Sequence, residues 1–227
     1  MKTIMLLVSI VVGIAACTST DKGGEPGANE FIYADYKIWG GEDRETVTIR
    51  VQFRQGGRNG AALVLTPPAA VTLDGETLLA DSVCKIGAFY EVQKQLNEFT
   101  GQHTINFRTK DGKEHKQVFS FEPFAIDALP EVATRKDLVF HLEALKDKSL
   151  LHIILTDTSF TSNDINSIDT VKDGRLPVSK ERLEALVNGP VSLQLIRNTT
   201  QVIREEGRRT GNLSITYSLH REFILND

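Results

Sequence analysis

The sequence predicts an all-β protein built from two β-sandwiches. Short runs in which apolar and polar residues alternate recur along most of the chain, for example at Val47, Ile49, Val51 and Phe53. Such alternation is typical of strands with one face in a core and the other in water. Asp-Gly and Asn-Gly pairs separate several of these runs and are typical of tight hairpin turns. The length of 227 residues is enough for one large domain or two small ones.

Residues 1–17 have the composition of an export signal. Lys2 gives a positive start, residues 4–16 are almost wholly apolar, and small residues precede Cys17. The apolar run is shorter than the roughly 20 residues that a membrane-spanning helix needs. A short positive start, an apolar core and a small-residue end together characterise secretory signal peptides. The segment Ile14-Ala15-Ala16-Cys17 also resembles a bacterial lipobox, where the signal is cut before a cysteine that carries a lipid anchor.

This resemblance implies that residues 1–16 are a cleaved signal peptide and that Cys17 is lipidated. Residues 17–29 are rich in Gly, Ser and Thr and are expected to form a flexible tether. We therefore expect a lipid-anchored protein of the bacterial cell envelope, at the outer membrane, on its periplasmic or its surface side. Cys84 lies in a strand-like run and is expected to be a core residue. An exported chain also permits a Cys17–Cys84 disulfide, which lipidation of Cys17 would prevent.

The first sandwich is expected to occupy residues 30–127. Strands are predicted around residues 46–53, 62–65 and 88–93, and Asp74-Gly75 predicts a tight hairpin within residues 71–78. Residues 96–124 contain a Thr-rich strand, an Asp-Gly turn and a returning strand. This pattern resembles the last hairpin of immunoglobulin-like domains in exported bacterial proteins. The resemblance implies an immunoglobulin-like β-sandwich.

A linker is expected in residues 125–134, where Pro130 stands and the alternation stops. Residues 136–227 are expected to form a second β-sandwich, so the predicted fold is two tandem immunoglobulin-like sandwiches with one short helix in the second. That helix is placed after Ser179, a suitable N-cap residue. Residues 157–176 are expected to be a polar connection, and residues 205–211 a charged hairpin tip.

The second sandwich is expected to begin with a hairpin. Its strands would lie at residues 138–142 and 150–156, with the turn at residues 146–149. In this register Phe140 pairs with Leu155 and Leu142 pairs with Ile153, which places the apolar side chains of both strands on one face. The core-facing residues are then Leu138, Phe140, Leu142, Leu151, Ile153 and Leu155.

Two groups of residues are candidate metal sites. In the predicted hairpin Glu143 lies opposite His152, with His141 on the same face, and two imidazoles with a carboxylate are suitable zinc ligands. Asp157, Asp164, Asp169 and Asp173 crowd one connection, but their spacing does not match the alternating acids of a calcium loop. We expect an exposed ion pair and a solvated loop, respectively, and therefore no metal and no cofactor.

Aromatic residues near the start of the first sandwich suggest a sugar-binding alternative. Strand alternation would place Phe31, Tyr33 and Trp39 on one face together with Asp35 and Lys37. Exposed rings can stack on sugar faces while polar neighbours bind the hydroxyl groups. Packing of the same rings in the core is the simpler expectation.

We expect a non-catalytic binding or assembly module with an envelope protein or a glycan as its partner. The sequence lacks the short motifs of hydrolases, zinc proteases and nucleotide-binding proteins. It assigns no catalytic residue and no ligand-binding residue. The formal net charge of −4 argues against a nucleic-acid partner. Two alternatives remain: a surface glycan-binding lipoprotein, and an enzyme with scattered or metal-dependent active-site residues.

The lipobox resemblance predicts that Cys17→Ser abolishes anchoring. Without the thiol no lipid can be attached, so the variant is expected to leave the membrane fraction and to lack the mass of the lipid. Cell fractionation and mass spectrometry of the purified protein measure both properties. A variant that remains bound to membranes with unchanged processing would contradict the prediction.

Overall fold

The computed structural model describes residues 31–83, 87–136, 138–159 and 164–227. The predicted signal peptide and tether, Cys17 and Cys84 lie outside these residues. The described chain is almost entirely β-structure, with one four-residue helix, α1 (Lys180–Leu183). The strands are β1 (Ile32–Gly41), β2 (Thr46–Gln55), β3 (Ala62–Leu63), β4 (Ala70–Leu73), β5 (Glu76–Thr77), β6 (Ala80–Val83), β7 (Gly87–Gln95), β8 (Gly101–Arg108), β9 (Glu114–Phe121), β10 (Ala125–Ile126), β11 (Val132–Thr134), β12 (Leu138–Glu143), β13 (Leu150–Asp157), β14 (Ile165–Thr170), β15 (Arg175–Val178), β16 (Gly189–Glu205) and β17 (Arg208–Asn226).

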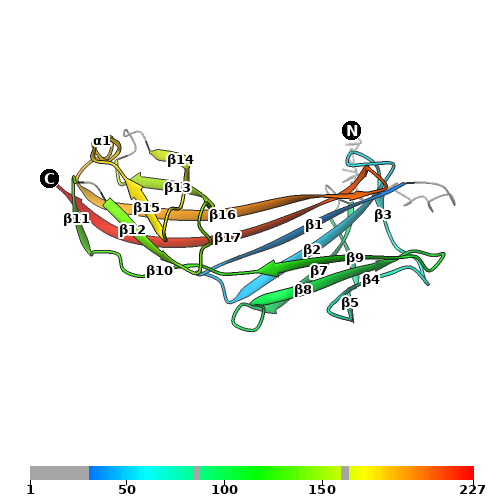
Figure 1. Cartoon of the computed structure of the whole chain (residues 1–227). Helices are drawn as coiled ribbons and strands as arrows, with labels where there is room; N and C mark the ends of the chain where they lie inside the picture. The colour runs from blue at the N-terminus through cyan, green and yellow to red at the C-terminus, as the bar shows by residue number, and fades with distance from the viewer. Residues whose placement is uncertain (1–30, 84–86, 137, 160–163) are drawn as a thin grey trace, which may run out of the picture.

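Two β-sandwiches lie in tandem along the long axis of the molecule (Figure 1). Each has one small sheet of its own: β5-β4-β8-β9 in the first sandwich and β10-β12-β15 in the second. Both share a ten-stranded sheet with the order β14-β13-β16-β17-β1-β2-β7-β6, on which β11 pairs with β17 and β3 pairs with β2. The predicted fold class is therefore confirmed.

A single long hairpin connects the two sandwiches. β16 has 17 residues and β17 has 19, and each strand extends across both sandwiches (Figure 1). Residues 211–218 of β17 pair in parallel with residues 34–41 of β1. The far half of the hairpin thus belongs to the sheet of the first sandwich, although the sequence analysis assigned all of residues 136–227 to the second. Alternation along a strand indicates which face is buried, but it does not indicate which strand lies beside it.

The first sandwich forms as its local sequence predicts. Val47, Ile49, Val51 and Phe53 of β2 are fully buried between the two sheets. Asp74 and Gly75 both have positive φ angles and connect β4 to β5 as the predicted tight turn. The Asp111-Gly112 pair likewise turns the chain between β8 and β9.

The predicted hairpin between β12 and β13 is wrong. β12 pairs with β10 and β15 in the small sheet, whereas β13 pairs with β14 and β16 in the ten-stranded sheet. The expected core face is nevertheless buried, with exposures of 9% or less at all six positions: Leu138, Phe140, Leu142, Leu151, Ile153 and Leu155. The two sets of residues lie on opposite sheets and are buried in the interior of the sandwich. Two strands on opposite sheets bury the same alternate residues as two strands of one hairpin, so the burial pattern fits both arrangements.

The expected polar connection between β13 and the helix contains two strands. β14 places Ile165 in the core but leaves Ile168 68% exposed, and its other residues are polar. This edge strand has too few apolar positions for the period of two to be visible in the sequence. Ser179 is the N-cap residue of α1 as expected, and Leu183 and Leu186 are buried behind it.

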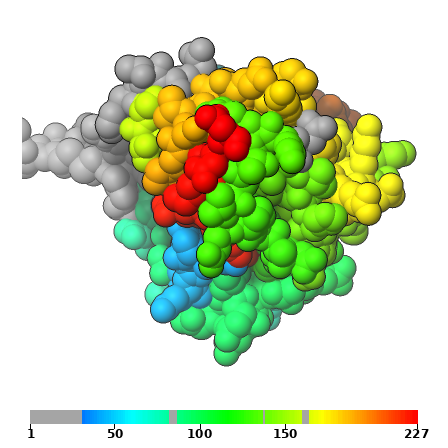
Figure 2. Space-filling view, turned by 90° about the vertical axis from the view of Figure 1, so that its left-hand side faces the viewer, coloured from blue at the N-terminus to red at the C-terminus, as the bar shows by residue number. Residues whose placement is uncertain are grey.

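At the far end of the second sandwich the last residues of β17 lie against β11 in a parallel pair (Figure 2). The described residues contain no helix that is long and apolar enough to cross a membrane.

Phe140→Ala is expected to destabilise the protein strongly, and His141→Ala weakly. Phe140 is fully buried, and removing a buried Phe side chain typically costs about 3–5 kcal/mol. His141, the next residue on β12, is exposed on the opposite face. Urea unfolding followed by far-UV circular dichroism measures both free energies. Equal effects of the two substitutions would contradict the observed orientation of β12.

Candidate functional site

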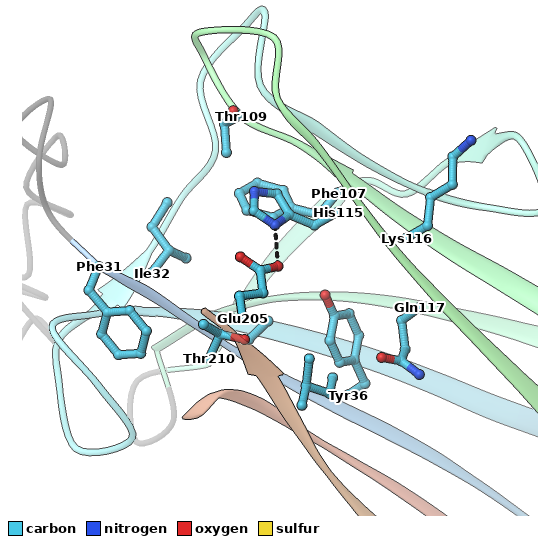
Figure 3. Close-up of a pocket in the computed structure, with 12 residues that line it drawn as sticks. Phe31, Ile32, Tyr36, Phe107, Thr109, His115, Lys116, Gln117, Glu205 and Thr210 are labelled. Atoms are coloured by element: carbon cyan, nitrogen blue, oxygen red, sulfur yellow. Dashed lines mark hydrogen bonds and ion pairs between the residues drawn. The ribbon is translucent and has the colours of Figure 1, made fainter. Parts of the chain in front are cut away.

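The tip of the long hairpin closes the open end of the first sandwich. Glu206 and Gly207 form its two-residue turn and both have positive φ angles. The turn places Glu205 of β16 beside the β8–β9 hairpin, which belongs to the opposite sheet (Figure 3). We call the space between the hairpin tip, β1 and β9 the seam cavity.

The seam cavity has a volume of about 220 Å³ and walls of mixed character. Apolar side chains from β1, β8 and β16 line part of it, and polar groups from β1, β9, β16 and β17 face the same space (Figure 3). A mostly apolar hollow with a few convergent polar groups is the usual form of a small-molecule site. The lining residues are Phe31, Ile32, Ala34, Tyr36, Phe107, Thr109, His115, Lys116, Gln117, Ile203, Glu205 and Thr210.

His115 and Glu205 join the two sheets at the cavity. Nδ1 of His115 lies 2.5 Å from Oε1 of Glu205, and the imidazole stacks on Phe107 with 5.5 Å between ring centroids. An ionised carboxylate can only accept a hydrogen bond. Nδ1 of His115 therefore carries a hydrogen and donates a hydrogen bond to Glu205. Lys113 lies 3.9 Å from the same carboxylate and adds a positively charged partner. The pair therefore fixes both the hairpin tip and the imidazole ring.

Tyr36 and Thr210 supply hydroxyl groups to the cavity. Burial, and secondarily the charge of Glu205, raises the pKa of Tyr36 well above its usual value, so its hydroxyl stays protonated. Oγ1 of Thr210 is buried and has no hydrogen-bond partner among the described residues. Buried polar atoms are nearly always hydrogen-bonded, so this hydroxyl has the capacity for one more hydrogen bond, to water or to another polar group.

The alternative row of sugar-stacking rings is not formed. Tyr33 is only 3% exposed, and Phe31 lines the seam cavity instead of the outer face of the sheet. Trp39 does lie on the outer face, where the guanidinium of Arg50 stands 5.2 Å from its ring and 4.6 Å from the ring of Phe89. The cation is already placed between the two rings. Burial, the simpler expectation, is observed for Tyr33, which β1 buries in addition to its inward-facing residues.

The predicted His141/Glu143/His152 face does not exist, because β12 and β13 belong to different sheets. His141 and Glu143 are exposed on β12, whereas Nε2 of His152 contacts Oδ1 of Asn166 on β14 at 2.6 Å. Across the described ranges, no three His, Cys, Asp or Glu side chains are grouped so that they could hold a metal ion.

Two of the four crowded aspartates have structural roles. The carboxylate of Asp157 accepts hydrogen bonds from the backbone N–H groups of Ser159 and Val187, each at 2.7 Å, and so ties the end of β13 to the segment after α1. Asp169 pairs with Arg182 at 2.8 Å. Asp164 is exposed on the solvent side and Asp173 forms the turn before β15. The four residues thus serve different parts of the fold.

Sequence reasoning missed the seam cavity. Residues 205–211 were expected to form a charged hairpin tip that is exposed to solvent. His115 is separated from Glu205 by 90 residues, and no local pattern connects them. The sequence contains one signal for this arrangement, the long polar run that precedes the tip. This run has the β-propensity of a strand although it lacks a visible apolar face.

No protein-family model matches this chain, and the search of curated proteins finds no match. Among solved structures, the crystal structure of the IG1 and IG2 domains of DIP-gamma aligns with 83% of this chain and 95% of its own. The two chains are 9% identical and the TM-score is 0.24. The assignment of the fold therefore relies on the strand order and sheet packing described above.

The contact between His115 and Glu205 predicts that Glu205→Gln loosens the hairpin tip. Both side chains are partly exposed, so the loss is expected to be about 1 kcal/mol, which corresponds to roughly fivefold faster opening. Hydrogen exchange of the amides in residues 203–211 measures this opening.

The matched control is Glu206→Gln, which removes the same charge one residue away in the turn. It should leave the exchange rates nearly unchanged. Equal acceleration by both substitutions would show that charge at the tip, and not the contact with His115, holds the hairpin.

Proposed function

We propose that this chain is a lipid-anchored protein of the bacterial cell envelope that binds a target without catalysis, with the seam cavity as its binding site. The observation that carries the proposal is the convergence of an unpaired Thr210 hydroxyl, the neutral Tyr36 hydroxyl and the Glu205 carboxylate on one partly apolar hollow. These groups provide both donors and acceptors for a polar ligand.

The anchoring part of the proposal rests on the sequence of residues 1–29. A lipid on Cys17 would attach the protein to the outer membrane, and the tether would let the sandwiches stand clear of the surface. The first described residue, Phe31, lines the seam cavity, so the tether would lead directly to the binding end.

A glycan is the ligand class that the cavity favours. Sugars present apolar ring faces next to hydroxyl groups, and proteins bind them with aromatic rings beside side chains that hydrogen-bond. Phe107 and Phe31 supply rings, while Gln117 adds an amide to the hydroxyl and carboxylate groups (Figure 3). This support comes from the cavity and not from the outer face around Trp39, where Arg50 already lies against the rings.

Tyr36→Phe is expected to weaken glycan binding about five- to tenfold, because one hydrogen bond contributes about 1 kcal/mol. Isothermal titration of the protein with cello-, xylo- and manno-oligosaccharides and with peptidoglycan fragments measures the affinity. Tyr33→Phe is the matched control, since Tyr33 is a buried tyrosine of the same strand outside the cavity lining.

The proposal fails if no oligosaccharide of the panel binds, or if the two variants bind equally well. Chromatography of the recovered ligand separates binding from catalysis. Shortened oligosaccharides would favour an enzyme in which the Glu205-oriented His115 acts on the ligand.

A further inference from the structure

One edge of the shared sheet is open along the far half of β16. β13 pairs with β16 only from Val191 to Ile196, while β17 pairs with it along its whole length. From Arg197 to Glu205, β17 is therefore the sole neighbour of β16 among the described strands. Alternate backbone N–H and C=O groups of this edge point away from β17, and they form a template for one more strand.

This edge lacks the features that usually prevent strand addition. Residues 198–203 carry no charge and no proline, and four of the six are β-branched. Native sheets commonly protect their edges with lysine, proline, bulges or very short strands. The irregularity in the pairing lies only at the tip, between Ile203 and Arg204.

The other free edges of the described sheets have such protection. β9 alternates Glu114 and Lys116 along its exposed side, and β15 contains Pro177. β14 carries Asp169 and has six residues, and β3, β5, β6, β10 and β11 are shorter still. The β16 edge is thus the long uncharged one.

The sequence of the edge is complementary to itself in the antiparallel direction. With Gln201 opposite Gln201 of a second copy, Arg197 faces Glu205, Thr199 faces Ile203, and Thr200 faces Val202. Opposite charges and pairs of β-branched residues directly across an antiparallel pair are stabilising. The outward-pointing N–H and C=O groups belong to every second residue of β16. Odd-numbered residues must therefore lie opposite odd-numbered residues of the second copy, and even-numbered residues opposite even-numbered ones. The register centred on Gln201 meets this condition.

The neighbouring structure restricts the register. A shift of two residues in one direction would place Glu205 opposite Leu195, where β13 already pairs with β16. A shift of two in the other direction would place Glu205 opposite Thr199 and leave Arg197 without a facing carboxylate. The register centred on Gln201 is therefore the one that uses the whole open edge and both charges.

A groove runs beneath this edge. Arg197, Thr199 and Gln201 point into a hollow of about 330 Å³ whose other walls include Leu213 and Phe119. Burial lowers the pKa of Arg197, yet the guanidinium stays charged and donates to the backbone carbonyl of Glu122. The inward-facing side chains of an added strand would cover the groove and bring a carboxylate to Arg197.

We infer that two copies of this chain pair through their β16 edges, antiparallel and about a twofold axis at Gln201, so that the two ten-stranded sheets become continuous. The interface is isologous, as in most homodimers, because the same edge serves both copies. It uses the outer edge of β16, and it shares Glu205 with the seam cavity, where this carboxylate also contacts His115.

Gln201→Cys tests the axis directly, in the full chain with Cys84→Ser to remove the other thiol of the sandwiches. Residues facing each other across an antiparallel pair have Cβ atoms about 4.5–5.5 Å apart, within reach of a disulfide after small adjustment. Copper-phenanthroline oxidation should therefore cross-link Gln201→Cys to a second copy. Thr199→Cys is the matched control, because it lies on the same face of β16 but about four residues from its own equivalent across the axis, roughly 13 Å.

Charge exchange on the opposite face of β16 tests the register independently. Thr200→Lys with Val202→Lys places like charges across the axis twice, whereas Thr200→Lys with Val202→Glu places opposite charges there. Cross-linking of Gln201→Cys should fall at least about fivefold in the first pair and return in the second. Circular dichroism confirms that each variant is folded, and the chain without an added cysteine measures any cross-linking through Cys17.

Three results would overturn the inference: Gln201→Cys forms no more dimer than Thr199→Cys, the two charge variants cross-link equally, or the main adduct contains a different protein. Oligosaccharide binding measured on the same variants separates this test from that of the seam cavity. Loss of the dimer with retained binding, or the reverse, identifies which proposal has failed.

Discussion

The parallel pairing of β1 with β17 is the contact on which the rest of the structure depends. It is the only seam in the described sheets at which the two sandwiches become one sheet, and it joins residues 34–41 to residues 211–218. Glycine stands at both of its ends. A Cβ on Gly211 would lie 2.5 Å from the carbonyl oxygen of Ala34, and one on Gly41 would lie 2.6 Å from Oγ of Ser218. The strands can approach at these points because the side chains are absent. Beyond the pairing, Arg221 donates two hydrogen bonds of 2.5 and 2.6 Å to the carboxylate of Glu42, and this fork ties β17 to the turn between β1 and β2.

This shared strand pair explains why one hydrophobic core extends through both sandwiches. Buried residues from β2 and β8 in the first sandwich and from β12, β13 and β16 in the second belong to a single contiguous cluster. Tyr217 lies at the junction, with its ring against Phe121 and Phe124 at centroid distances of 6.0 and 5.3 Å. Edge-to-face aromatic contacts of this kind add specific geometry to the burial of area. The linker after β9 therefore passes over a packed junction, and the two sandwiches are held by side chains as well as by the sheet.

The same hairpin that joins the sandwiches also creates both proposed binding surfaces. Its inner side, at the tip, closes the seam cavity through Glu205 and His115, and its outer edge leaves backbone groups of β16 open. The hairpin extends past β13 because its second half packs on the first sandwich. Among the described strands of that sandwich, none pairs with the outer edge of β16. The extension places the outer edge of β16 away from the second sandwich and along the first sandwich. The cavity and the edge consequently lie on one structural element, although they would serve different partners.

The sequence by itself determined the fold class and most of the buried faces. Alternation in residues 46–53 located β2 and its core side, and the Asp-Gly pairs located the turns after β4 and β8, because these features depend only on neighbours along the chain. The tertiary structure decided which strands lie side by side. Phe140 and Ile153 were expected in the core, and both are buried, but they lie on opposite sheets of a sandwich and not on one hairpin. Both arrangements bury the same alternate positions. The site belonged entirely to the tertiary structure. Tyr36, His115 and Glu205 are far apart in the sequence, and only the docking of the hairpin tip on the opposite sheet brings their polar groups into one cavity.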